Sequence, residues 1–138
     1  MGSPLLLARD LWRRTENHDL DRFGLAFQGE GAAFEEFALR AGDYALSMVA
    51  AVVRRADGAA HDVRIRVGAV TDRPTALPSV EAAVEGSALT PTSAREAGAA
   101  AAAAIETYGS IHASADYLRE LTGTLVERAL LRAWDAAA

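Results

Sequence analysis

Two apolar segments on either side of the dipeptide Asp57-Gly58 constrain the fold of this chain more than any other feature. Along residues 44–54 both alternating sets of side chains are apolar, which is typical of a strand covered on both faces. Along residues 62–70 the set predicted to face the core is Val63, Ile65, Val67 and Ala69, and the set predicted to point away is Arg64 and Arg66. Asp-Gly is favourable turn chemistry, so the segments predict a β-hairpin with a loop of about five residues.

The flanking sequence predicts helices and one short strand. Residues 33–40 have helical spacing and are followed by Gly42. Residues 75–77 lie between two prolines, which suits an edge strand. Helices are predicted over residues 78–85, over residues 91–107 with Thr90 as N-cap, and from Ser114 to the C-terminal region. We therefore expect an N-terminal arm over residues 1–30 and one α+β domain over residues 31–138, with a small antiparallel sheet of two to three strands packed with a helical bundle.

Composition excludes several classes of chemistry. The chain has no cysteine, and all 14 of its lysine-plus-arginine residues are arginine. Thiolate metal sites, disulfides, Schiff-base lysines and Walker-type phosphate loops are thereby excluded. Only three histidines are present and they are scattered, so we predict no dedicated metal site. The net charge of −5 disfavours nucleic acid as a partner, and no apolar run is long enough to span a membrane, so we expect a cytoplasmic protein.

Polar residues in two loops are candidates for catalysis or ligand binding. Asp43 could accept a hydrogen bond from a ligand, with Tyr44 beside it as a donor or acid, although Asp43 also suits a turn after Gly42 and Tyr44 suits a core. His112 and Asp116 are four residues apart and would share one face if the segment were helical, forming an acid–base pair.

The alternative places the helix start near Ser114, with Asp116 in its first turn and Tyr117 next to it. Arg64 and Arg66 lie two apart on one predicted strand face, where they could bind an anionic ligand or an acidic partner. A solvated sheet face is the simpler interpretation of that arginine pair.

Three stretches resemble one known family in order along the chain. They are residues 34–46 (FEEFALRAGDYAL), residues 63–70 followed by Asp72-Arg73-Pro74, and residues 111–117 (IHASADY) with residues 125–130 (LVERAL). Over residues 31–133 these are similar to the C-terminal domain of the FAD-binding medium subunit of molybdenum hydroxylases, the carbon monoxide dehydrogenase and xanthine dehydrogenase family. The resemblance implies the α+β fold and partners that carry flavin, molybdopterin and iron–sulfur centres.

The sequence also departs from that family pattern. Ser110 stands where the family commonly has aspartate, and Leu118 stands where it commonly has arginine. In the family, a dinucleotide-binding region with glycine-rich loops precedes this domain, and residues 1–30 contain no such loops. The resemblance therefore implies a stand-alone or split domain with a structural or assembly role, which has FAD only if a partner chain supplies the binding domain.

Two other functions remain open at this stage. The domain could be a cofactor-free cyclase or isomerase acting on a hydrophobic secondary metabolite, with Tyr44, His112, Asp116 and Tyr117 as acid, base or hydrogen-bond donor. It could also be a module that binds a small ligand or self-associates into an oligomer. The sequence does not separate these two alternatives, because fold does not fix function.

Overall fold

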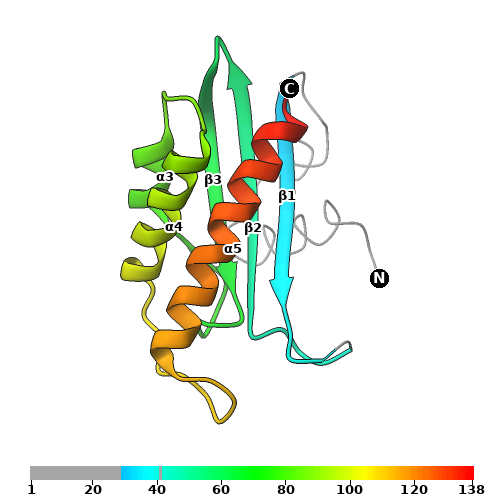
Figure 1. The fold of residues 1–138 in the computed structure, drawn as a ribbon, viewed down its shortest axis with the longest axis vertical. Helices are drawn as coiled ribbons and strands as arrows, with labels where there is room; N and C mark the ends of the chain where they lie inside the picture. Colours follow the sequence, from blue (N-terminus) through cyan, green and yellow to red (C-terminus); the bar gives the residue numbers. More distant parts are fainter. Residues whose placement is uncertain (1–28, 41) are drawn as a thin grey trace.

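The computed structural model describes residues 29–40 and 42–138, so nearly all of the predicted arm over residues 1–30 lies outside the described residues. Four antiparallel strands in the order β1-β2-β3-β4 form one sheet, with α5 packed across it and α4 beside α5 (Figure 1). The strands are β1 (Glu30–Phe37), β2 (Ser47–Ala56), β3 (Ala59–Gly68) and β4 (Thr75–Ala76). The helices are α3 (Pro78–Val84), α4 (Pro91–Ala104) and α5 (Ala115–Ala136). The α+β class is confirmed, with four strands instead of two or three.

The predicted hairpin is present as β2 and β3. Its turn contains only Asp57 and Gly58, both with positive φ (53° and 74°), so the loop is shorter than predicted because the strands pair as far as Ala56 and Ala59. Side chains of both strands that face the helices are at most 5% exposed: Val49, Ala51, Val53, Val63, Ile65 and Val67. On the opposite face Ala50 and Val52 are also buried, so the prediction of two covered faces is confirmed. Ala69, predicted to lie in the core, is exposed beyond the end of β3.

The helix predicted over residues 33–40 is wrong. Residues 30–37 form β1, which pairs antiparallel with β2 from Glu30↔Arg54 to Phe37↔Ser47. The apolar positions of so short a segment fit either a helix or a strand. The strand is favoured because all eight residues of β1 pair with β2. Helix α5 crosses β1 closely at Gly31, where a side chain would overlap the carbonyl of Ala133.

Capping residues begin the two long helices, as predicted. Thr90 and Ser93 form a reciprocal capping box at the start of α4, where Thr90 Oγ1 accepts from the Ser93 N–H at 3.1 Å. Ser114 Oγ accepts from the Tyr117 N–H at 3.1 Å at the start of α5. However, α4 ends at Ala104, three residues earlier than predicted, because Ile105 adopts an extended conformation. None of the helices in the described part of the chain combines the length and apolar character needed to cross a bilayer.

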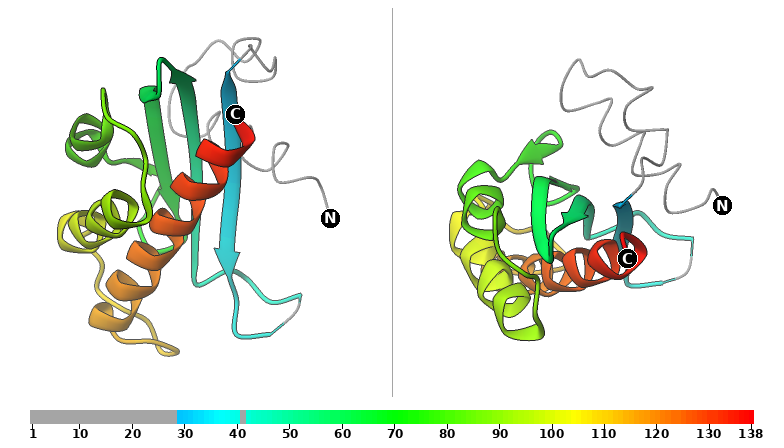
Figure 2. Two further views of the ribbon diagram at one scale, coloured as in Figure 1. Left: turned by 45° about the horizontal axis from the view of Figure 1, so that its top comes forward. Right: turned by 90° about the horizontal axis from the view of Figure 1, so that it is seen from above.

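Helices α4 and α5 pack side by side (Figure 2). Their backbones meet at two glycines, Gly98 of α4 and Gly123 of α5. A Cβ atom added to Gly123 would lie 2.6 Å from the Gly98 carbonyl oxygen, so the two backbones are in direct contact. A buried hydrogen bond of 2.7 Å joins Ser47 Oγ to Thr122 Oγ1 and ties α5 to β2. The Thr122 hydroxyl donates to the Leu118 carbonyl, which leaves Ser47 as the donor in this pair.

Candidate functional site at the loop end of the domain

Loops that follow β1, β3 and α4 meet at one end of the domain, the lower end in Figure 1. They enclose an open cleft of about 580 Å³, which we call the loop cleft. Its apolar lining comes from Leu39, Leu46, Val70 and Leu118, and its polar lining includes Arg40, Asp43, Tyr44, Ser110 and His112. The loop cleft therefore combines segments that are about 70 residues apart in the sequence.

Three of the predicted site residues, Asp43, Tyr44 and His112, line the loop cleft together. All three are exposed, and Tyr44 is 98% exposed, so Tyr44 does not pack in a core. In the described part of the chain, no hydrogen bond or ion pair joins their side chains to one another. The Asp43 N–H donates to the Arg40 carbonyl at 3.1 Å, which fits the turn interpretation. These residues share one solvent-exposed cleft without forming an acid–base network.

Asp116 and Tyr117 do not line the loop cleft. Asp116 lies in the first turn of α5 and forms an ion pair of 3.1 Å with Arg119, with its own side chain 94% exposed. Tyr117 is 45% exposed on the same turn. His112 precedes α5, so His112 and Asp116 do not share a helical face. This geometry favours the role of Asp116 in the electrostatics of the helix start.

The two arginines of β3 are already engaged. Arg66 is only 3% exposed, and its guanidinium donates to Glu81 Oε2 of α3 and to the Ile65 carbonyl, both at 3.0 Å. Arg64 is half-buried and also has an interaction partner. Strand alternation predicted Arg66 on an outward face, but it could not indicate that a glutamate of α3 pairs with it there.

Four large side chains in the loops at this end of the domain are exposed, and we call them the apolar rim: Leu39, Tyr44, Tyr108 and Ile111. Of these, only Tyr44 was predicted as a site residue. Tyr108 and Ile111 are 98% and 95% exposed, and Leu39 is 54% exposed. Tyr108 also lines a second cleft of about 530 Å³, which shares Val70 and Thr107 with the loop cleft. The available signal was the occurrence of large apolar residues in loops rich in glycine and serine.

Within residues 29–40 and 42–138, histidine, aspartate and glutamate side chains form no group of three able to hold a metal ion. The site is thus an open, mixed polar and apolar cleft bordered by exposed aromatic rings, which suits contact with another molecular surface or with a flat ligand.

Comparison with known proteins agrees with the fold. The chain is 38% identical over 103 residues to the nicotine 6-hydroxylase medium subunit of Paenarthrobacter nicotinovorans, a match that covers 75% of this chain and 36% of that protein. A structure of carbon monoxide dehydrogenase from Hydrogenophaga pseudoflava matches with a TM-score of 0.76 and 32% identity, over 82% of this chain and 39% of that one. The structure of quinoline 2-oxidoreductase from Pseudomonas putida 86 matches with a TM-score of 0.74 and 30% identity, over 78% of this chain and 38% of that one.

The chain thus spans little more than a third of the length of these relatives. Residues 32–133 match the family described as the CO dehydrogenase flavoprotein C-terminal domain, which agrees with the resemblance carried by the three sequence stretches. That match includes all four strands except the first two residues of β1, and all three helices except the last three residues of α5. The chain belongs to the CO dehydrogenase flavoprotein C-terminal domain family.

Proposed function

We propose that this chain serves as the C-terminal domain of a molybdenum hydroxylase flavin subunit, in an assembly role, with FAD held by a partner chain. The observation that carries the proposal is the apolar rim of Leu39, Tyr44, Tyr108 and Ile111 at the loop end. Exposed large apolar side chains can mark contact sites, and aromatic residues are enriched in interfaces. The proposed partners carry flavin, molybdopterin and iron–sulfur centres.

The groups in the loop cleft fit one side of a flavin ring better than a pyrophosphate. A pyrophosphate is usually held by backbone N–H groups of a glycine-rich loop or by several cationic groups. The loop cleft offers one arginine, Arg40, and the Asp43 carboxylate beside it would oppose a phosphate. Its exposed Tyr44 ring and apolar floor suit stacking against an aromatic system. FAD would supply electron transfer, and this chain would cover and shield the ring.

A binding experiment with matched tyrosine variants tests the proposal. The full chain would be co-expressed with candidate flavin-, molybdopterin- and iron–sulfur-carrying chains, and the affinity of the purified complex would be measured. We expect Tyr44→Ser combined with Tyr108→Ser to weaken assembly at least about tenfold, because both rings would lose buried contact area. Tyr117→Ser, outside the loop cleft, is the control and should assemble normally.

Two results would contradict the assembly role. One is the absence of a stable complex with any flavin-carrying chain. The other is equal affinity for the double variant and the wild type, with both folded by circular dichroism. If the chain purified alone bound FAD stoichiometrically and became yellow, the proposal that a partner holds the flavin would be wrong.

A second candidate is a cofactor-free cyclase or isomerase, and the observation that favours it is the shared cleft of Asp43, Tyr44 and His112. An acid and a base that line one cleft with apolar walls could shape and protonate a hydrophobic substrate. The chain alone should then turn over such a substrate, and His112→Gln should abolish that turnover. If the chain has only the assembly role, the wild type itself should show no turnover.

A further inference from the structure

A β-bulge in the β2–β3 hairpin carries our further inference. Val52 pairs with Arg64 and Arg54 pairs with His61, so the single residue between them on β2 faces two residues on β3, Asp62 and Val63. Asp62 has a φ of +52°. In a regular strand successive N–H groups point to opposite edges, whereas a bulge with a left-handed residue can turn two successive N–H groups to the same side.

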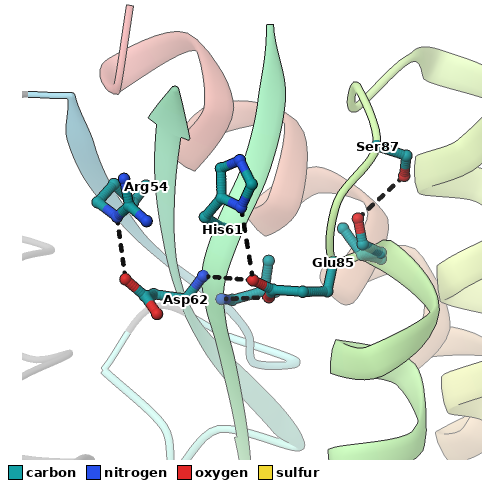
Figure 3. Close-up of polar contacts among 7 residues, drawn as sticks. Arg54, His61, Asp62, Glu85 and Ser87 are labelled. Atoms are coloured by element: carbon teal, nitrogen blue, oxygen red, sulfur yellow. Dashed lines mark hydrogen bonds and ion pairs between the residues drawn. The ribbon is translucent and has the colours of Figure 1, made fainter. Parts of the chain in front are cut away.

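Both of these N–H groups bind one carboxylate. Glu85, the C-cap residue of α3, accepts from the Asp62 N–H with Oε1 at 2.8 Å and from the Val63 N–H with Oε2 at 3.1 Å (Figure 3). His61 Nδ1 lies 3.9 Å from Oε1 of the same carboxylate. Each carboxylate oxygen of Glu85 thus has its own backbone donor, so the two N–H groups bind the carboxylate in a bidentate manner.

The bulge is held in place by interactions that do not use the Glu85 side chain. Arg54 Nε donates to Asp62 Oδ2 at 2.9 Å and fixes the side chain of the bulged residue. The Ala60 N–H donates to the Ser87 carbonyl at 2.8 Å, and the Gly86 N–H donates to the Ala60 carbonyl at 2.7 Å. These contacts, together with the hairpin register, should keep the two N–H groups in position when Glu85 is removed.

We propose that the bulge at Asp62–Val63 is a preformed carboxylate-binding site, which Glu85 fills within the chain and which a free carboxylate can occupy when Glu85 is replaced. The site also fixes the end of α3. This inference is independent of the assembly role proposed above.

Anion rescue of the variant Glu85→Ala tests the site in the full chain. Thermal unfolding would be measured in sodium acetate or sodium formate and in sodium chloride of equal ionic strength. We expect acetate and formate to raise the melting temperature of Glu85→Ala by about 2–5 °C relative to chloride, because an anion that binds only the folded state stabilises it. The buried residues Val80 and Val84 should keep α3 attached, so the variant remains folded.

Two further variants separate specific binding from general salt effects. Glu85→Gln fills the space with a neutral group and should show no acetate effect, and Glu96→Ala, an exposed glutamate on α4, should behave like the wild type. In amide NMR spectra of Glu85→Ala, acetate should shift the signals of Asp62 and Val63 in a saturable way. Equal stabilisation of wild type and Glu85→Ala by acetate, an equal effect of chloride, or unshifted Asp62 and Val63 signals would each overturn the proposal.

Discussion

Replacement of Gly123 by alanine tests how closely α4 and α5 must approach. The added Cβ atom would lie 2.6 Å from the Gly98 carbonyl oxygen, whereas ordinary van der Waals contact begins at about 3.4 Å. The helices would therefore have to separate locally by about 0.8 Å, the difference between these two distances. Because the obstacle is backbone, no side-chain rotation can relieve the overlap.

The expected loss of stability is about 2 kcal/mol. Overpacking of a close contact costs about 1–3 kcal/mol, and a backbone obstacle places this variant at the upper end of that range. Alanine regains about 1 kcal/mol through its higher helix propensity. In the double variant with Gly98→Ala the helices have already moved apart. Its loss of stability should therefore be clearly smaller than the sum of the losses of the two single variants.

Urea denaturation followed by far-ultraviolet circular dichroism measures these values, with unchanged m-values as the check for two-state unfolding. Thr124→Ala is the control, since Thr124 is exposed on the next position of α5 and its change should stay within about 0.5 kcal/mol. A Gly123→Ala variant as stable as the wild type, or more stable, would refute the argument that the crossing requires glycine.

Three further predictions concern buried contacts. Thr122→Val should lower the free energy of unfolding by about 2 kcal/mol, because it leaves the fully buried Ser47 hydroxyl without its acceptor. Adding Ser47→Ala should recover part of this loss, and denaturation experiments on both variants measure it. Arg66→Met should lower the free energy of unfolding by about 3 kcal/mol, because Glu81 would lose its buried partner. A decrease below about 1 kcal/mol would show that this ion pair is not needed for stability. Gly31→Ala should reduce stability by about 2 kcal/mol through overlap with the backbone of α5, which a melting curve would detect as a lower melting temperature.

Local chemistry predicted those elements whose signals act over a few residues. The Asp57-Gly58 turn, the Thr90 and Ser114 caps, and the alternation of Val63, Ile65 and Val67 depend on neighbouring residues alone. The three sequence stretches also indicated the family. For the turn, the caps and the alternation, the signal and the structure it specifies lie within a few residues of each other.

Tertiary contacts decided the remaining features. The segment at residues 30–37 contains alanine and glutamate, which favour helices in isolation. It forms β1 because its backbone pairs with β2. At Gly31 the absence of a side chain lets α5 pack closely against this strand. Likewise Arg66 is buried because α3 places Glu81 beside it, and Tyr44 shares a cleft with His112 because two loops end at the same side of the sheet. Sequence determined the periodicity, caps and turns of this protein, because these are set by neighbouring residues. Only the packed structure decided which distant segments meet, because that depends on the free energy of contacts between whole elements.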